Sequence, residues 1–295
     1  MNDATEPNIA LWGHNKLDLD GCFDGAADIL LFCDKQSIGE AQLASFSPLK
    51  VLASPTTNDD HIDLSYCRKR GIEVITLKGD TEFLYTITPT AEHTWGLIHA
   101  VHRRIPTASK QAEPWNRWHH GAPKMLSQST LLVVGRGRVG HFVYETGRTL
   151  CKKVLHYSAD PKRASRQPLH HLAQQADILA ICISWHPNNR NFINDWIIEA
   201  LPNGAIIVNT SHGDTLDLDV TIDHLESGHL WGAALDVLPG ELEVEWPPQV
   251  RRAFAYAQTH DNLIITPHIA GSTEDAWKAT QGRVLQRAIE KWRTM

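Results

Sequence analysis

The run Thr130-Leu-Leu-Val-Val134, followed at once by Gly135-Arg-Gly-Arg-Val-Gly140, decides the fold of this chain. The first five residues are apolar or β-branched and end at a glycine, which predicts a short buried strand. Residues 141–150 predict a helix that follows the glycines. A Gly-x-Gly-x-x-Gly motif is a weak signal by itself, but between a strand and a helix it is typical of a dinucleotide-binding turn.

Each glycine of this motif has an expected task. Gly135 would permit the tight turn, Gly137 would let the backbone approach a pyrophosphate, and Gly140 would let the helix pack closely on the strand. The N–H groups at the start of the helix would then face the phosphates. The expected cofactor-binding residues of this turn are Gly135, Gly137, Arg138, Val139 and Gly140.

The alternation of strands and helices continues on both sides of this motif. After residue 140, further strands are predicted at 154–157, 177–184, 205–209, 230–237 and 262–266. Before residue 107, strands are predicted at 8–12, 28–32, 49–53 and 72–77. Other helices are expected at 62–70, 90–104, 169–176, 195–201, 218–226 and 273–293. Unbroken apolar strands separated by helices predict parallel sheets covered on both faces, so the expected fold class is α/β with two doubly wound parallel-sheet domains.

Length and composition agree with a two-domain globular protein. The chain has 295 residues, 42% of them hydrophobic, and a formal net charge of −6, so nothing indicates a nucleic-acid surface. The longest apolar runs are strand-sized and shorter than the roughly 20 residues that span a bilayer. The first residues, MNDATEPNIA, lack the basic and apolar regions of a signal peptide, so no membrane partner and a cytoplasmic location are expected. The five cysteines show no CxxC spacing, and no metal site is predicted.

The position that would choose between NAD and NADP does not carry the usual acidic residue. Ser158 follows the strand predicted at 154–157, where an Asp or Glu would bind the adenosine ribose. Asp160 could bend back to the ribose, whereas Lys162 and Arg163 could bind a 2′-phosphate. The expected cofactor is therefore NAD or NADP, with the choice open.

Six segments of the chain resemble the D-isomer-specific 2-hydroxyacid dehydrogenases, a family that includes phosphoglycerate, glyoxylate/hydroxypyruvate and phosphite dehydrogenases. The segments before residue 130 are PLKVLASPTTNDDHIDLSYCRKRGIEVI (48–75) and TPTAEHTWGLIHAVHRRIP (88–106). Those after it are VVGRGRVG (133–140), LPNGAIIVNTSHGDTLD (201–217), GHLWGAALDVLPGE (228–241) and NLIITPHIAGST (262–273). The last three match the family's catalytic segments in order and spacing. The resemblance covers nearly the whole chain and is far more specific than the glycine motif alone.

The resemblance implies two similar α/β domains with the substrate in the cleft between them. Residues 1–107 plus 268–295 would form a flavodoxin-like substrate/catalytic domain, and residues 108–267 a Rossmann NAD(P)-binding domain. The implied reaction (EC 1.1.1.-) transfers hydride between a nicotinamide cofactor and a 2-hydroxy/2-keto acid or a related small anion. Members are usually dimers through the cofactor domain, so a homodimer is expected.

The resemblance also assigns the chemistry to three residues. His268, in TPHIAGS, would be the acid/base that protonates the substrate's carbonyl oxygen as hydride arrives, a task that suits an imidazole. Glu241, in LDVLPGE, would hydrogen-bond to this histidine and fix its tautomer. His212 lies where the family has an arginine that clamps the substrate's carboxylate and polarises its carbonyl. Losing a charge-assisted bond of that kind costs roughly 1.5–3 kcal/mol.

Two hypotheses about His212 remain open. In the first, it serves as a cation beside an anionic substrate, and activity falls as the pH rises above neutral. In the second, catalysis is weakened or lost, and the chain is a non-enzymatic NAD(H)-binding regulatory module. The joint presence of Glu241 and His268 favours the first hypothesis, an active oxidoreductase.

Further residues are expected at the cofactor or the substrate. The cofactor set also includes Ser158, Cys182, Ser184, Thr210, Asp236 and Gly271, with Asp236 matching a carboxylate that contacts the carboxamide. In the first domain, the turn that would hold the substrate's acid group reads Pro55-Thr-Thr-Asn-Asp-Asp60. It has no glycine, and Asp59 and Asp60 add negative charge, which argues against an ordinary small 2-keto acid.

Overall fold

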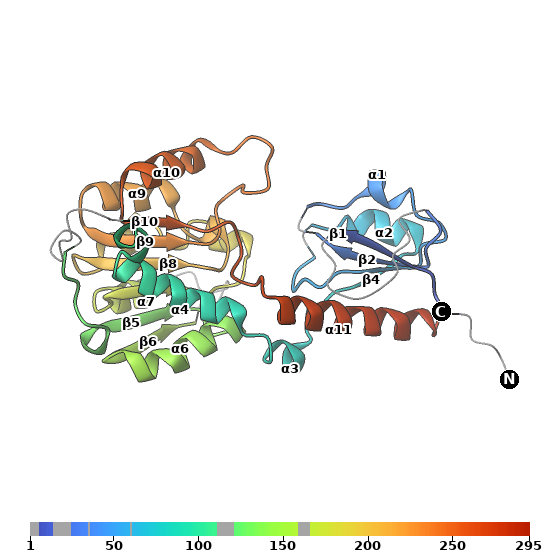
Figure 1. Ribbon diagram of the computed structural model, residues 1–295, viewed down its shortest axis with the longest axis horizontal. Helices are drawn as coiled ribbons and strands as arrows, with labels where there is room; N and C mark the ends of the chain where they lie inside the picture. The colour runs from blue at the N-terminus through green and yellow to red at the C-terminus, as the bar shows by residue number, and fades with distance from the viewer. Residues whose placement is uncertain (1–5, 14–24, 35, 60, 111–120, 159–165) are drawn as a thin grey trace. The chain divides into compact units, whose positions relative to one another are not determined.

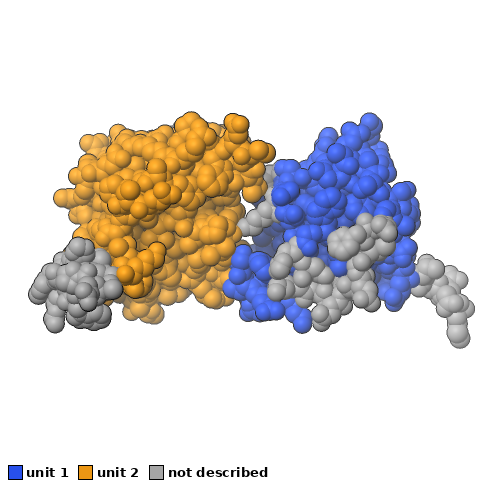
Figure 2. Space-filling view, turned by 45° about the horizontal axis from the view of Figure 1, so that its top comes forward, with its two compact units in different colours: residues 1–87, 272–295 blue, residues 88–271 orange. Residues whose placement is uncertain are grey.

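The computed structural model describes residues 6–13, 25–34, 36–59, 61–110, 121–158 and 166–295. The chain forms two compact units, residues 1–87 with 272–295 (unit 1) and residues 88–271 (unit 2), coloured separately in Figure 2. The units divide at 87/88 and 271/272, whereas the sequence placed the boundaries at 107/108 and 267/268. The helix α4 (Pro89–His102) packs on the sheet of unit 2, and the turn that carries His268 is hydrogen-bonded to that sheet.

Unit 1 contains a four-stranded parallel sheet in the order β1-β2-β3-β4. Its elements are β1 (Ile9–Gly13), β2 (Ile29–Cys33), α1 (Glu40–Leu43), β3 (Val51–Ala53), α2 (Leu64–Arg70), β4 (Glu73–Ile75), α3 (Thr81–Leu84) and α11 (Glu274–Trp292). Successive side chains of a strand face opposite sides, so Leu30 and Leu52 pack with α2 while Leu31 and Val51 pack with α11. The C-terminal helix therefore belongs to unit 1, although the strand before it belongs to unit 2.

Unit 2 contains a six-stranded parallel sheet in the order β10-β9-β8-β7-β5-β6. Its strands are β5 (Thr130–Val134), β6 (Lys153–Tyr157), β7 (Ile178–Ile181), β8 (Ala205–Asn209), β9 (Leu230–Leu235) and β10 (Leu263–Ile265). Its other helical elements are α5 (Ile105–Ala108), η1 (Leu126–Gln128), α6 (Arg138–Leu150), α7 (Gln167–Ala173), η2 (Pro187–Asn189), α8 (Asp195–Glu199), η3 (Gly213–Thr215), α9 (Leu218–Glu226) and α10 (Pro248–Thr259). Helices α4 and α6 cover one face and α7 to α10 the other, so the sheet is doubly wound (Figure 1).

These two parallel-sheet units confirm the expected fold class. One strand end and one long helix are among the details that differ from the sequence-based expectation. The strand expected at 177–184 ends at Ile181, after which the chain turns. The helix α10 was not expected, although Val250, Ala253 and Tyr256 give it a buried face at helical spacing. Within the described residues, every helix is too short or too polar to span a bilayer.

The strand order of unit 2 creates a switch point at β5. The chain passes from β5 to its neighbour β6 and then returns to β7 on the other side of β5. Ligands of open α/β sheets bind outside the carboxyl ends of the strands at such a point. The expected site residues after β5, β7, β8, β9 and β10 all lie at this edge because the strands are parallel.

Candidate active site

The loop after β5, residues 135–140, is built on close backbone contacts, and we name it the glycine turn. Gly135 has a φ of +96°, a left-handed conformation that disfavours a side chain, and a Cβ there would lie 2.5 Å from the carbonyl oxygen of Cys182. A Cβ on Gly140 would lie 1.9 Å from the carbonyl oxygen of Gly135. Both positions require glycine because the chain itself occupies the space that a side chain would need.

Gly137 is different, because none of the residues that the structure describes requires it to be glycine. A Cβ built there meets no atom of these residues within 4 Å, and Gly137 is exposed. Gly137 is also the N-cap of α6 and gives the first turn of that helix no side-chain hydrogen bond. The open space and the uncapped helix start fit a phosphate group, which backbone N–H groups would bind at the positive end of the helix dipole.

The side chains that follow in this turn are partly covered. Arg138 and Val139 are half-buried in the first turn of α6. Burial lowers the pKa of the Arg138 guanidinium, which nevertheless stays protonated at neutral pH. Arg138 therefore carries a positive charge on the first residue of α6, directly after Gly137 in the chain.

Ser158 lies next to the glycine turn. It is exposed and follows Tyr157, whose carbonyl oxygen accepts a hydrogen bond from Gly135 N at 2.7 Å. This is where the ribose of a dinucleotide on the turn is expected. The other three residues considered for cofactor choice, Asp160, Lys162 and Arg163, lie outside the described residues.

The loop after β8, residues 209–215, is held by side chains, and we name it the histidine turn because it carries His212. The buried Asn209 donates from Nδ2 to the His212 carbonyl oxygen at 3.0 Å and accepts at Oδ1 from Ser211 N at 3.0 Å. Thr215 Oγ1 donates to the same His212 carbonyl at 2.6 Å. These bonds determine the backbone path through His212.

The imidazole of His212 is restrained on two sides. It stacks on the indole of Trp185, with ring centroids 4.4 Å apart and an interplanar angle of 12°. Its Nδ1 accepts a hydrogen bond from Asp214 N at 3.3 Å, and Asp214 Oδ2 lies 3.7 Å from the same atom. The His212 side chain is 32% exposed, so solvent reaches it. An imidazole cannot offer the planar fork of five donors that an arginine presents.

Gly213 brings the histidine turn against the loop after β9. A Cβ on Gly213 would lie 2.0 Å from the carbonyl carbon of Leu238 and 2.3 Å from Pro239 N. Leu238 N in turn donates to Glu241 Oε2 at 2.9 Å. The histidine turn and Glu241 are therefore connected through one close backbone contact.

His268 and Glu241 are in direct contact, through His268 Nδ1 and Glu241 Oε1. His268 has a φ of +53°, in the left-handed region that residues other than glycine rarely adopt. Its backbone N–H donates to the carbonyl oxygens of Asp236 and Thr266, both at 2.9 Å, and these bonds hold the unusual conformation. A strained backbone at a histidine paired with a carboxylate motivates the hypothesis of a functional site.

The carboxylate of Asp236 is committed to the loop that carries His268. Oδ1 accepts from Thr266 Oγ1 at 2.6 Å and from Ile269 N at 2.9 Å, while Oδ2 accepts from Ala270 N at 2.8 Å. The Asp236 side chain is 0% exposed. The family resemblance implies a contact with the carboxamide of a cofactor, which stays a prediction, and in this structure both oxygens accept hydrogen bonds from the loop. A buried carboxylate needs hydrogen-bond donors, and the hydroxyl of Thr266 and two backbone N–H groups of this loop supply them.

The other residues expected at the cofactor lie at the same edge. The Thr210 hydroxyl points to α4, where it lies 2.7 Å from Thr94 Oγ1. Cys182 packs on the glycine turn, and burial raises the pKa of its thiol to about 12, so it is not a nucleophile at neutral pH. Ser184 and Gly271 are exposed.

Four residues of this edge were not expected from the sequence: His93, Thr94, Trp185 and Asn209. His93, on α4, places Nε2 3.2 Å from Thr266 Oγ1 and 3.5 Å from a carboxylate oxygen of Asp236. Helical periodicity marks α4 as a buried helix, but it does not tell which strand ends its polar residues reach. An asparagine at the end of an apolar strand was the one signal that could have identified Asn209.

In unit 1, the turn expected to hold a substrate's acid group is described up to Asp59. Lys78 Nζ donates to Asp59 Oδ2 at 3.0 Å, so a cation balances this carboxylate. Ser54 Oγ lies 3.2 Å from Thr56 Oγ1 and 3.3 Å from His61 Nε2. The expected gain of negative charge is therefore offset at Asp59, while Asp60 lies outside the described residues.

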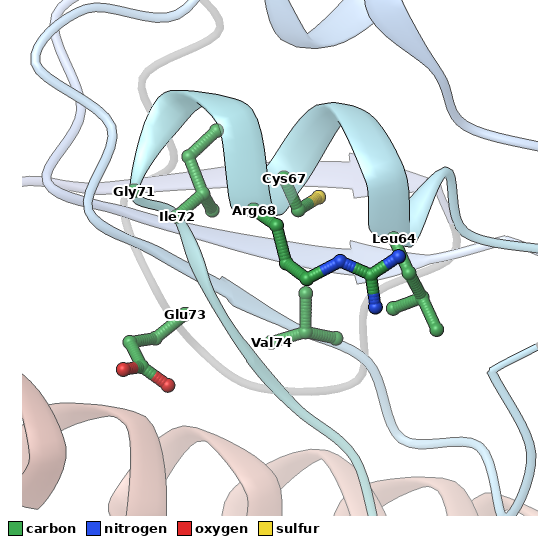
Figure 3. A pocket seen from close by; sticks show the side chains of 7 residues that line it. All are labelled: Leu64, Cys67, Arg68, Gly71, Ile72, Glu73 and Val74. Carbon is green, nitrogen blue, oxygen red and sulfur yellow. The ribbon is translucent and has the colours of Figure 1, made fainter.

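A depression of about 320 Å³ lies elsewhere in unit 1, between α2 and the β4 segment (Figure 3). Its lining residues are Leu64, Cys67, Arg68, Gly71, Ile72, Glu73 and Val74. None of them is an expected site residue, and burial raises the pKa of the Cys67 thiol, which keeps it unreactive. In the part of the chain that the structure describes, no three His, Cys, Asp or Glu side chains are grouped to hold a metal.

Comparisons with known proteins agree with this arrangement. Residues 95–270 match the family model described as D-isomer specific 2-hydroxyacid dehydrogenase, NAD binding domain. A Haemophilus influenzae protein named as a 2-hydroxyacid dehydrogenase is 31% identical over 275 residues, which cover 90% of this chain and 84% of that protein. A D-specific alpha-keto acid dehydrogenase of Enterococcus faecium is 29% identical over 249 residues, which cover 82% of this chain and 76% of that enzyme.

Solved structures extend the similarity to three dimensions. The D-lactate dehydrogenase of Aquifex aeolicus, complexed with NAD and lactic acid, matches with a TM-score of 0.73 at 25% identity, covering 91% of this chain and 84% of that one. The family model spans the segments that carry the glycine turn, the histidine turn and the pair formed by His268 and Glu241. The chain therefore belongs to the D-isomer specific 2-hydroxyacid dehydrogenase family.

Proposed function

We propose that this chain is a NAD(P)-dependent oxidoreductase that transfers hydride between a nicotinamide cofactor and a 2-hydroxy/2-keto acid or a related small anion. The observation that carries the proposal is the contact between His268 and Glu241 at the sheet edge where the glycine turn also lies. Family membership supports the reaction class, because relatives include enzymes named for D-lactate and for alpha-keto acids.

The glycine turn supports the cofactor half of this proposal. The open space at Gly137 and the uncapped start of α6 fit a pyrophosphate, with Arg138 beside it. A bound nicotinamide dinucleotide would supply the hydride for reduction or accept it in oxidation. Ser158 would face the adenosine ribose, and Thr210 and Ser184 remain candidates for the nicotinamide half. A titration that compares NADH with NADPH tests which of the two cofactors the chain prefers.

In this proposal His268 is the acid/base and Glu241 orients it. The Glu241 carboxylate at Nδ1 favours a proton on that nitrogen, so Nε2 exchanges the proton with the substrate. In reduction, Nε2 donates a proton to the carbonyl oxygen while hydride adds to the carbonyl carbon. In oxidation, Nε2 takes the hydroxyl proton as the hydride leaves that carbon. The bond from Leu238 N to Glu241 Oε2 holds the carboxylate in place before substrate arrives.

The test is a panel of pyruvate, glyoxylate, hydroxypyruvate and phenylpyruvate, measured with NADH and NADPH between about pH 5 and 9. We expect turnover of at least one acid and a loss of about 10²- to 10⁴-fold in His268→Asn. Asparagine is the chosen replacement because it tolerates the left-handed backbone of residue 268. Tight cofactor binding without turnover of any acid would contradict the proposal.

A second candidate function is a non-enzymatic NAD(H)-binding regulatory module, and His212 in place of the family's arginine favours it. It predicts cofactor binding without turnover and a partner interaction that depends on the cofactor's redox state. His212→Arg separates the two, because a guanidinium at this position can stack on Trp185 and clamp a carboxylate. A large rise in 2-keto acid reduction would indicate an active site with a weakened clamp. No change would indicate that the substrate side has diverged.

Two further expectations stay predictions. By its resemblance, the chain would form a homodimer through the cofactor domain. The lack of a signal-peptide pattern in its first residues leads us to expect a cytoplasmic location. Light scattering tests the first by asking whether the mass in solution is twice that of the 33.0 kDa chain. Cell fractionation tests the second.

A further inference from the structure

Trp185 and His212 form a stacked pair at the carboxyl edge of the sheet in unit 2. The strands before them, β7 and β8, are parallel neighbours, so the loops that follow both strands lie at the same edge. The two ring centroids are 4.4 Å apart and the planes differ by 12°. This flat contact fixes the plane of the imidazole, because a tilt of the ring would lose contact with the indole face.

The loop that carries Trp185 is itself held in place. Asn189, only 3% exposed, donates from Nδ2 to the carbonyl oxygen of Ser184 at 2.9 Å. Its backbone N–H donates to the carbonyl oxygen of His186 at 2.7 Å. The indole is therefore a half-buried platform on an ordered loop, with its backbone anchored on both sides.

A second restraint fixes the rotation of the His212 ring within that plane. Asp214 N donates to Nδ1 at 3.3 Å, and a nitrogen that accepts from a backbone N–H carries no proton of its own. The ring proton then resides on Nε2. The charged groups near Nδ1 include Asp214, whose Oδ2 lies 3.7 Å away. Arg190 lies 3.4 Å from the other Asp214 oxygen and partly balances its charge.

We propose that Trp185 is a positioning residue that holds His212 as a single neutral N–H donor toward the substrate. The stack sets the plane of the ring and the bond from Asp214 N sets its rotation, so Nε2–H has one direction. This inference rests on the proposed function for its substrate, a 2-keto acid that accepts one hydrogen bond from the donor. It replaces the earlier hypothesis of a cationic His212 with a preorganised neutral donor.

The test compares three variants in the full-length chain. Trp185→Leu removes the flat face, Trp185→Phe retains it, and Trp196→Leu is the matched control. Trp196 also stacks on a histidine, His170, with centroids 4.2 Å apart and planes at 18°, but it contributes nothing to the site. Each variant is measured for kcat and KM on the acid panel, for NADH affinity, for melting temperature and by NMR of protein labelled with ¹⁵N-histidine. The His212 ring signal is the one absent from His212→Gln.

We expect wild type to show His212 as the neutral ring protonated at Nε2. In Trp185→Leu, that signal should broaden or split, and kcat/KM should fall about tenfold, mainly through KM, with NADH affinity within about twofold. Trp185→Phe should recover most of both properties, and Trp196→Leu should match wild type. If Trp185→Leu retains the wild-type signal and kcat/KM, or Trp185→Phe behaves like Trp185→Leu, the positioning role is wrong. Protonation of both ring nitrogens at neutral pH would overturn the neutral donor.

Failure of the proposed function gives a different result. In that case wild type turns over no acid in the panel, while the NMR comparison still reports whether Trp185 orients the His212 ring. A folded Trp185→Leu is recognised by its melting temperature. If Trp185→Leu does not fold, the NMR signal of the His212 ring in Trp185→Phe tests the proposal. Loss of the single tautomer in Trp185→Phe would contradict it.

Discussion

The glycine turn after β5 and the histidine turn after β8 lie at the same edge of one parallel sheet, with β7 between their strands. The backbone path of the glycine turn depends on the absence of side chains, since a Cβ on Gly140 would lie 1.9 Å from a carbonyl oxygen. The backbone path of the histidine turn depends on side chains, because Asn209 and Thr215 both donate hydrogen bonds to the carbonyl of His212.

This difference predicts that the two turns tolerate substitution differently. A turn whose backbone must pass through a narrow space cannot change its glycines without moving the chain. In the histidine turn, the residues around position 212 hold the backbone, so the residue at position 212 can be substituted without moving it. The side chain at position 212 could therefore change while the backbone that presents it stays anchored.

The largest effect is expected from a substitution that disrupts the glycine turn itself. Gly140→Ala should destabilise the folded chain by at least about 3 kcal/mol, because its Cβ would lie 1.9 Å from the Gly135 carbonyl oxygen. Gly137→Ala should leave the melting temperature near wild type, because its Cβ meets no atom within 4 Å, and should instead weaken NADH binding at least tenfold. Thermal unfolding and a fluorescence titration separate the two. Equal stability loss in both variants would mean that Gly137 is also required by packing.

The next effect concerns the carboxylate connected to the histidine turn. Glu241→Gln should lower kcat about 100-fold, or about 2.7 kcal/mol, because an amide can accept from His268 Nδ1 but cannot stabilise the charged ring. NADH affinity should stay unchanged. The control is Glu245→Gln, an exposed carboxylate in the same loop, which should keep wild-type kcat. Steady-state kinetics decide, and equal losses in the two variants would remove Glu241 from the proposed chemistry.

A smaller effect tests whether side chains lock the histidine turn. Thr215→Val keeps the shape of a fully buried residue but removes the hydroxyl that donates to the His212 carbonyl. The free energy of unfolding should therefore be about 2 kcal/mol lower than in wild type. KM for the acid should rise while NADH affinity holds. Thr149→Val removes a similar bond from the exposed surface of α6, to the Thr146 carbonyl, and should change stability by less than about 0.5 kcal/mol. A neutral Thr215→Val would mean that the turn does not need this lock.

The smallest effect sharpens the cofactor side. Ser158→Asp places a carboxylate beside the glycine turn, where it can bond to a ribose hydroxyl and repel a 2′-phosphate. The preference for NADH over NADPH should rise about tenfold, or about 1.4 kcal/mol, relative to wild type. Ser227→Asp, at the exposed end of α9, should leave the ratio unchanged. Competitive titrations measure both ratios, and an unchanged preference in Ser158→Asp would place the ribose elsewhere.

Much of the fold could be predicted because its signals are local. The apolar run of β5 and the glycines behind it predict strand, turn and helix within twenty residues of chain, and the structure contains all three. The helix α10 was not predicted because only a few of its residues form the buried face and most of the others are polar. The two units divide at other residues than the expected domain boundaries, because periodicity identifies α4 as a buried helix without saying which sheet it covers.

The site residues likewise divide into those that the sequence predicted and those that it did not. The family resemblance predicted His268 and Glu241, and the structure brings them into contact although 27 positions separate them. It also places Asp236 at the cofactor, which stays a prediction, and the structure adds that this carboxylate accepts hydrogen bonds from the loop after β10. Trp185 was not predicted at all, because no local pattern says that a tryptophan after one strand will stack on a histidine after the next.

The sequence by itself determined the family, the parallel α/β architecture and the position of the glycine turn, because each depends on residues close together in the chain. Tertiary structure alone decided how Asp236 is used, what orients His212 and which unit α4 joins. Those outcomes depend on side chains from different strands and helices meeting at one sheet edge. Their distances follow from packing the whole unit, which no local stretch of sequence specifies.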